Sequence, residues 1–142
     1  MAKYFTLAEL TNSSIAKQFK INNTPPEDAI SHLEELMVAL DSLREFYGKP
    51  IGISSGYRCK ALNQKLSSSS PTSVHMIGYA ADMYPVKGTF DEFKKVCQDW
   101  AKSHSFDQLL IERNSKGSKW IHLGLYNNSH QQRKQIKWMS VK

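Results

Sequence analysis

Two histidines and one aspartate stand out in the sequence because their types and spacing suit a metal centre. His75 precedes Asp82 by seven positions, with Gly78 between them, and His122 follows in a segment that alternates like a strand. Two imidazoles and one carboxylate form a common ligand set for catalytic zinc, which leaves a fourth position for water. Spacing alone also permits ordinary surface or core histidines, because the chain has five histidines in 142 residues.

Four short segments surround these positions. They read FTLxEL at 5–10, SSGYRC at 54–59, SxHxxGxAxD at 73–82 and WIH at 120–122. Together they resemble the signature of the M15 zinc peptidases, a family that includes D-Ala-D-Ala carboxypeptidases and phage L-alanyl-D-glutamate endolysins. The likeness runs from about Phe5 to Trp138, and its first and last segments resemble the compact branch found in phage and prophage genomes.

The resemblance implies one zinc ion, held by His75, Asp82 and His122, in a peptidase that cleaves the stem peptides of bacterial peptidoglycan. Zinc with three protein ligands polarises a carbonyl group and lowers the pKa of water toward about 7. A prophage lysis enzyme is the expected setting. Carboxypeptidase and endopeptidase action both stay open, because the choice depends on the length of the cleft.

A general base is also needed, and the sequence offers Glu112 for this role. Some family members carry an acid three residues before the last histidine ligand, where this chain has Lys119. If two strands pair around a five-residue loop, Glu112 faces Trp120 and shares a face of the sheet with His122. A shift of one residue in the pairing register of these two strands would instead place Glu112 on the other face of the sheet from His122. Asp107, or no protein base nearby, is the alternative.

Five residues are candidates for binding the substrate: Arg58, Asn63, Ser73, Gln108 and Trp120. Arg58 resembles the family arginine that contacts substrate and stabilises charge on the carbonyl oxygen, which also makes it a catalytic candidate. Asn63 and Ser73 match motif positions that shape the pocket, and Gln108 shares the expected face of the base. Each of these residues also has a plainer interpretation. Arg58 could form a surface salt bridge, and Trp120 could pack in the core. Asn63 and Ser73 could simply hold the loop through local hydrogen bonds.

The elements that must position these residues indicate an α+β fold in a single domain over residues 1–142. Apolar residues at helical spacing predict a long helix over 25–47, with Thr24 as its N-cap and Gly48 at its end. Thr89 begins a second helix. Strands are expected at 51–54, 79–84, 107–113, 119–126 and 136–141. Helices segregated from strands favour a small, mainly antiparallel sheet packed against helices, as in hedgehog/DD-peptidase-like domains.

Composition and charge indicate one globular domain, with 40% hydrophobic and 23% charged residues. No run approaches the roughly 18 apolar residues of a membrane helix, so no membrane partner is expected. Because Glu9 interrupts the first segment, no signal peptide is expected, and the chain would be made in the cytoplasm and act on the wall after release. The formal charge of +6 fits a solvated surface or attraction to a polyanion. Without a long basic block, no nucleic-acid partner is expected.

Two other function classes stay open. A zinc-containing binding or structural module of a phage or cell-wall system would keep the ligands without hydrolysis, and the missing acid before His122 keeps this alternative open. A non-haem iron oxygenase also uses two histidines and a carboxylate, but its first histidine and acid usually stand two residues apart. His32, His104 and His130 are expected to be solvated, Cys59 and Cys97 to be reduced, and the chain to be a monomer.

Overall fold

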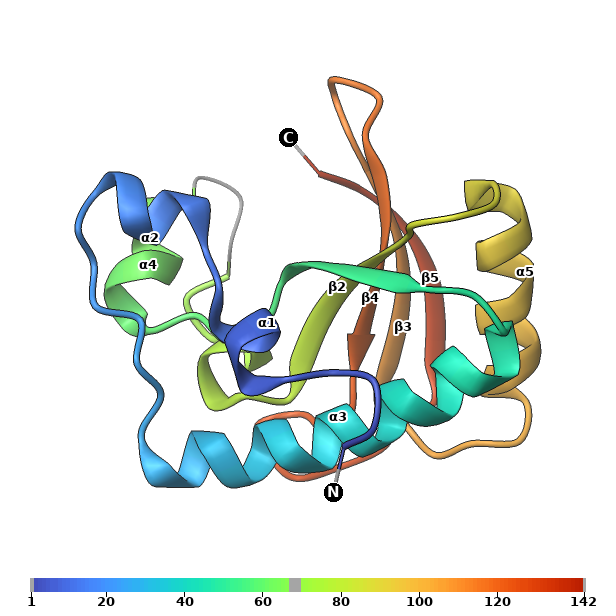
Figure 1. Ribbon diagram of the computed structural model, residues 1–142, viewed down its shortest axis with the longest axis horizontal. Coiled ribbons are helices and arrows are strands. Elements are labelled where there is room, and N and C mark those ends of the chain that lie inside the picture. Colours follow the sequence, from blue (N-terminus) through green and yellow to red (C-terminus); the bar gives the residue numbers. More distant parts are fainter. Residues whose placement is uncertain (1, 67–69, 142) are drawn as a thin grey trace.

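In residues 2–66 and 70–141, the part of the chain that the computed structural model describes, five strands form one sheet. The strands are β1 (Ile51–Ser55), β2 (Ala80–Pro85), β3 (Gln108–Asn114), β4 (Lys119–Gly124) and β5 (Gln135–Val141). Their order across the sheet is β1-β2-β4-β3-β5 (Figure 1). All neighbours are antiparallel except β3 and β5, which run parallel.

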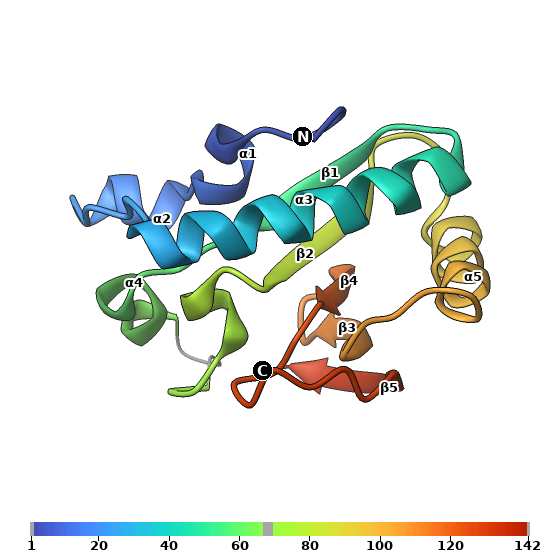
Figure 2. The same cartoon turned by 90° about the horizontal axis from the view of Figure 1, so that it is seen from below.

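Helices lie along one side of this sheet and at its ends. They are α1 (Leu7–Thr11), α2 (Ser14–Gln18), α3 (Glu27–Tyr47), α4 (Lys60–Lys65), the 3-10 helix η1 (Val74–Ile77) and α5 (Phe90–Ala101). Helices α2 and α4 lie together at one end of the molecule, and α5 lies at the other end, as both views show (Figures 1 and 2). The expected α+β fold with a mainly antiparallel sheet is confirmed.

The two faces of the sheet differ because side chains alternate along each strand. Leu109 of β3 pairs with Leu123 of β4, and Ile111 pairs with its neighbour Ile121 in the same register. These odd-numbered side chains are buried, and apolar side chains of α3 and α5 complete the same core. The even-numbered residues therefore point to the opposite face, where the polar candidates lie.

The long helix α3 begins two residues later than the sequence predicts. Thr24, the expected N-cap, donates its hydroxyl hydrogen to Asn22 Oδ1 at 2.7 Å, and its backbone N–H contacts the same oxygen. This local turn competes with helix capping, so Pro26 becomes the N-cap and makes no side-chain cap bond. Gly48 ends the helix in the left-handed conformation, as expected.

Two of the three histidines expected to be solvated are in fact packed. His32 Nδ1 lies 2.7 Å from the carbonyl oxygen of Ile77, and His104 stacks on Trp100 with ring centroids 4.5 Å apart. His130 is exposed. An imidazole presents a flat apolar surface as well as two polar nitrogens, so tertiary neighbours can bury it. Cys59 and Cys97 are both free thiols. Within the described residues, no helix has the length and apolar character to cross a membrane.

Candidate metal centre

Three side chains from separate elements converge on the polar face of the sheet. His75 lies in η1, Asp82 in β2 and His122 in β4, and their ligand atoms all lie within 4.8 Å of one another. His75 Nε2 is 3.4 Å and His122 Nδ1 is 3.0 Å from Asp82 Oδ1. The two imidazole rings meet edge to face with centroids 5.1 Å apart. These three expected ligands could therefore hold one metal ion.

Strand register brings two of these ligands together. Asp82 is the direct partner of His122 in the β2–β4 pair, so both side chains leave the same face of the sheet. The third ligand, His75, is placed by the turn that follows η1. Gly78 ends η1 at a φ of 88°, and a Cβ there would lie 2.6 Å from the carbonyl oxygen of Ala29. Only glycine lets η1 approach α3 this closely.

A backbone carbonyl fixes the orientation of the His75 ring. His75 Nδ1 lies 2.7 Å from the Gly56 oxygen, so Nδ1–H donates and Nε2 is left to face Asp82. Sequence reasoning missed this role of Gly56, although its position within the SSGYRC segment was the available signal. A Cβ at Gly56 would lie 2.2 Å from the oxygen of Leu10, which also accepts a hydrogen bond from Tyr57 N at 2.7 Å. Three of the motif-bearing segments therefore meet behind the ligands.

The protonation states that His75 and Asp82 favour in this site are those that bind a cation. Burial lowers the pKa of His75, and although Asp82 opposes that shift, the ring favours its neutral form. Burial would by itself raise the pKa of Asp82, but His75 and His122 hold that pKa far below its usual range. A neutral imidazole and an ionised carboxylate are the forms in which these residues bind metals. The donor set therefore fits a divalent ion.

Glu112 lies on the same face as the three ligands. It pairs with Trp120 across the β3–β4 ladder, and the next pair on that face joins Leu110 to His122, so the register predicted from the five-residue loop is confirmed. Burial and the charge of Asp82 raise the pKa of Glu112. Its carboxylate can therefore hold a proton more readily than an exposed one.

The alternative base, Asp107, has a different partner. Its Oδ1 accepts a hydrogen bond from Arg133 Nε at 2.7 Å, and its Oδ2 accepts one from Arg133 Nη2 at 2.8 Å. Both carboxylate oxygens are therefore occupied by one guanidinium, and the side chain is 2% exposed. This bidentate ion pair leaves Asp107 poorly placed to accept a proton from water.

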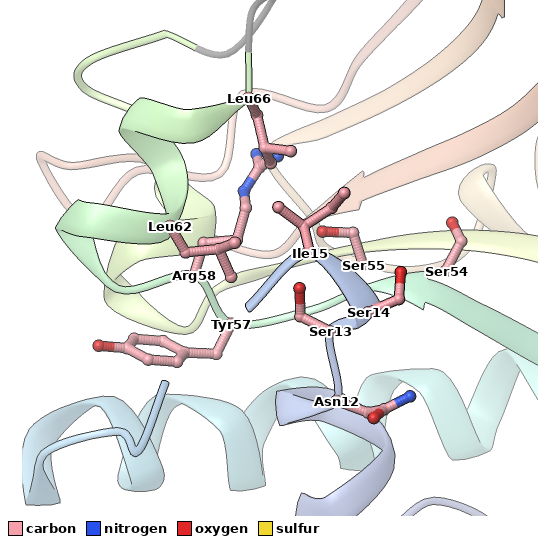
Figure 3. A pocket seen from close by; sticks show the side chains of 10 residues that line it. All are labelled: Asn12, Ser13, Ser14, Ile15, Ser54, Ser55, Tyr57, Arg58, Leu62 and Leu66. Atoms are coloured by element: carbon pink, nitrogen blue, oxygen red, sulfur yellow. The ribbon is translucent and has the colours of Figure 1, made fainter. Parts of the chain in front are cut away.

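Arg58 bridges the ligand set and a neighbouring cavity. Its Nη2 donates to Ser73 Oγ at 3.1 Å, and its backbone N–H donates to the His75 oxygen at 3.1 Å. Burial lowers its pKa, while the nearby charges of Asp82 and Glu112 oppose that shift. Its buried Nε has no hydrogen-bond partner in residues 2–66 and 70–141. The side chain also lines a cavity of about 150 Å³ beside α2, β1 and α4 (Figure 3).

The match to known proteins covers the three ligand residues, Glu112 and Arg58. A family model described as Peptidase M15 matches residues 3–124, which is most of the chain. The chain belongs to the Peptidase M15 family. Membership in this family indicates a peptidase, and the matched span contains His75, Asp82 and His122, the group that could hold a metal ion. No curated protein matches this M15 peptidase.

The remaining candidate residues of the M15 peptidase differ in what they contact. Ser73 Oγ accepts hydrogen bonds from Arg58 and from the His75 backbone, so it supports the site directly. Trp120 is the cross-strand partner of Glu112 on the site face, and its indole N–H, near the Glu112 carboxylate, opposes the rise in the pKa of that group. Asn63 is buried in α4, where its Nδ2 donates to the Ser70 oxygen at 2.8 Å and thereby holds the loop.

Gln108 lies on the site face of β3, at the opposite end of the strand from Glu112. Its Nε2 donates to Gln135 Oε1 at 3.0 Å, which links β3 to β5. Gln108 also lines a pocket beside His122. The expectation that Gln108 shares the Glu112 face of the M15 peptidase is therefore confirmed, because alternate residues of a strand lie on one face.

Proposed function

We propose that this M15 peptidase binds one zinc ion and hydrolyses peptide bonds in the stem peptides of bacterial peptidoglycan. The observation that carries the proposal is the common face shared by the ligand set and Glu112. His75, Asp82 and His122 supply two nitrogens and a carboxylate, the donor set that zinc prefers at catalytic sites. Zinc, when bound, supplies a Lewis acid that polarises the carbonyl group and makes water more acidic.

Glu112 acts as the general base in this proposal. It accepts a proton from the attacking water as the water oxygen bonds to the carbonyl carbon. It then donates that proton to the departing amine nitrogen as the C–N bond breaks. A raised pKa suits both steps, because the group must take up a proton and release it again near neutral pH.

Arg58 stabilises the negative charge that develops on the carbonyl oxygen as water adds to the carbonyl carbon. Its guanidinium is restrained by Ser73 and partly desolvated, so little reorganisation is needed when negative charge develops. The plainer interpretation of Arg58 as a surface salt bridge loses support, because it forms no ion pair with any described residue.

The proposed setting is lysis by a phage or prophage, with a monomer acting on the cell wall. The resemblance of the opening and closing segments to the compact phage branch supports this setting. Lys119 stands where some family members have an acid, which keeps a non-catalytic zinc module open as an alternative. Glu112 weakens that alternative, because the strand register brings its carboxylate to the ligand face from β3.

Digestion of purified peptidoglycan tests the proposal. Zinc-loaded wild type is expected to release products visible by mass spectrometry, as free D-Ala for a carboxypeptidase or as internal cuts for an endopeptidase. A chelator should abolish release, and zinc should restore it. Glu112→Gln should reduce the rate by about 10²- to 10⁴-fold, whereas Glu34→Gln, an exposed change on α3, should not. Zinc binding without any cleavage would instead support the binding module.

A further inference from the structure

Asn128 joins the segment between β4 and β5 to the loop that leads into the metal centre. Its side-chain Nδ2 donates a hydrogen bond to the backbone oxygen of Thr72 at 2.7 Å, across 56 positions of the sequence. The family match ends at residue 124, so Asn128 lies outside the matched region, whereas Thr72 lies inside it. The hydrogen bond therefore ties the ligand region to a part of the chain that the family match does not cover.

The segment between β4 and β5 is itself held in place. Asn127 Oδ1 accepts hydrogen bonds from the backbone N–H groups of Ser129 at 2.9 Å and Gln131 at 2.8 Å. Near the end of the segment, Arg133 donates to both carboxylate oxygens of Asp107. The amide that reaches the loop is consequently presented from a well-anchored support.

The loop on the other side of this hydrogen bond is a β-turn over residues 70–73. Ser73 N donates to the Ser70 oxygen at 3.2 Å, and Pro71 stands at the second position of the turn, where its fixed φ is favourable. The peptide group between Thr72 and Ser73 is therefore fixed at both of its polar atoms. Its N–H is held by the turn, and its carbonyl oxygen is held by Asn128.

Ser73 transmits this constraint to the site. Its Oγ accepts hydrogen bonds from Arg58 Nη2 at 3.1 Å and from His75 N at 3.2 Å. One side-chain torsion joins Oγ to the backbone, so the position of Oγ follows the backbone of Ser73. A shift of the preceding peptide group would therefore move the acceptor that restrains the guanidinium. The His75 ring has a separate restraint, because its Nδ1 contacts the Gly56 oxygen.

We propose that Asn128 is a positioning residue of this peptidase: its hydrogen bond to the loop fixes Ser73, which in turn holds the Arg58 guanidinium in place. The inference rests on the proposed peptidase function, in which Arg58 stabilises developing charge. Such a donor is effective only when it is held in place before the reaction, so a loosened guanidinium lowers kcat. Asn128 also lines the pocket beside His122, and a direct contact with substrate there would instead raise KM.

Steady-state kinetics of zinc-loaded Asn128→Ala on a synthetic stem peptide test the inference. We expect kcat to fall about 5- to 20-fold and KM to change less than about twofold. Asn128→Asp keeps the size of the side chain but has no N–H₂ group to donate, so it should show a similar loss. A loss carried by KM would assign Asn128 to substrate binding and overturn the inference, as would an unchanged kcat.

Zinc affinity and a matched variant serve as controls. Zinc affinity of Asn128→Ala should stay within about twofold of wild type, because the His75 ring keeps its contact with Gly56. Gln64→Ala removes an exposed amide of α4 and should leave kcat, KM and zinc affinity unchanged. A large fall in zinc affinity in Asn128→Ala would place its effect on the metal ligands and overturn the inference.

A double-mutant cycle separates action through Ser73 from an independent effect. Ser73→Ala removes the Oγ that Arg58 contacts, so adding Asn128→Ala should lower kcat by less than about twofold further. Arg58→Lys is the second background if Ser73→Ala folds poorly, and the added loss should again be small. Losses that multiply in the background used would overturn the inference.

Hydrogen exchange at Arg58 Nε gives a readout that needs no activity. This N–H is buried, so it should exchange slowly with water in wild type. Its signal in the NMR spectrum of isotope-labelled, zinc-loaded protein is assigned by its loss in Arg58→Lys. Asn128→Ala should raise the exchange rate at least about fivefold, whereas Gln64→Ala should not change it. A fall in kcat without faster exchange would overturn the inference.

The two proposals fail in different ways. If wild type cleaves the peptide and Asn128→Ala keeps both its kcat and its slow exchange at Arg58, the peptidase function stands and the positioning role is wrong. If wild type cleaves neither peptide nor peptidoglycan, but Asn128→Ala speeds exchange at Arg58 only when Ser73 is present, the role of Asn128 in holding Arg58 stands and the peptidase function is wrong.

Discussion

His75 Nδ1 lies 2.7 Å from the carbonyl oxygen of Gly56, and this contact decides which ring nitrogen faces Asp82. The carbonyl is available because Gly56 itself lies against the backbone of Leu10, where no side chain would fit. A histidine held in one tautomer and one orientation loses less freedom when it binds a metal ion. The ligand set is therefore preorganised by backbone atoms from two earlier segments.

We expect chelator-treated protein to bind one zinc ion per chain and His75→Ala to weaken that binding by at least about 100-fold, because one of three protein ligands is lost. Zinc at about 100 times its dissociation constant should stabilise wild type by about 2.7 kcal/mol. Competition with a chromophoric chelator and denaturation with and without zinc measure both effects. His130→Ala, a change at an exposed histidine, is the control. Unchanged zinc affinity in His75→Ala would contradict the assigned ligand.

Gly78→Ala should destabilise the protein more than Gly117→Ala. Both glycines have a φ near 87°, so alanine is strained at both, at a cost of about 1–2 kcal/mol. A Cβ at Gly78 would also meet the Ala29 oxygen at 2.6 Å, whereas a Cβ at Gly117 meets nothing within 4 Å. Urea denaturation should therefore show an additional loss of about 1–3 kcal/mol for Gly78→Ala. Equal losses would mean that η1 can move away from α3 freely.

The Asp107–Arg133 pair should stabilise the fold in a pH-dependent way. Burial raises the pKa of Asp107, but the hydrogen bonds and charge of Arg133 outweigh it, so the pKa falls below its ordinary value. The stabilisation is therefore complete above the ordinary Asp pKa of about 3.9 and is lost as the pH falls through the lower folded value. Asp107→Asn should cost about 1–3 kcal/mol near pH 7.

Urea denaturation of wild type and Asp107→Asn from about pH 7 to about pH 3 measures this effect. The difference in unfolding free energy should stay constant down to about pH 5 and shrink below about pH 4. Asp99→Asn, which breaks only surface ion pairs of α5, should change stability by less than about 1 kcal/mol. A difference that grows on acidification would show that Asp107 is not held in its charged form.

Arg58→Lys should lower kcat/KM by about 10- to 100-fold, with most of the loss in kcat. A lysine has no planar fork, so it cannot keep the Ser73 contact and also face the carbonyl oxygen. Steady-state kinetics on a peptide substrate measure the change, and Arg113→Lys, at an exposed position near the end of β3, serves as the matched control. A rise in KM with kcat unchanged would assign Arg58 to substrate binding alone.

Local sequence determined much of this protein. Apolar spacing predicted α3 and the β3–β4 hairpin, because helix and strand periods are properties of neighbouring residues. The five-residue loop then fixed the pairing register, which placed Glu112 on the face of His122. Resemblance to a family supplied the ligand set of His75, Asp82 and His122, which spacing alone left ambiguous.

Tertiary structure decided the features that depend on contacts between distant segments. Alternation is the same in parallel and antiparallel strands, so it could not reveal that β5 would run parallel to β3. The hydrogen bond from His75 to Gly56 and the ion pair between Asp107 and Arg133 join residues 19 and 26 positions apart. No local propensity encodes such pairs, because their stability comes from burial that exists only once the chain has folded.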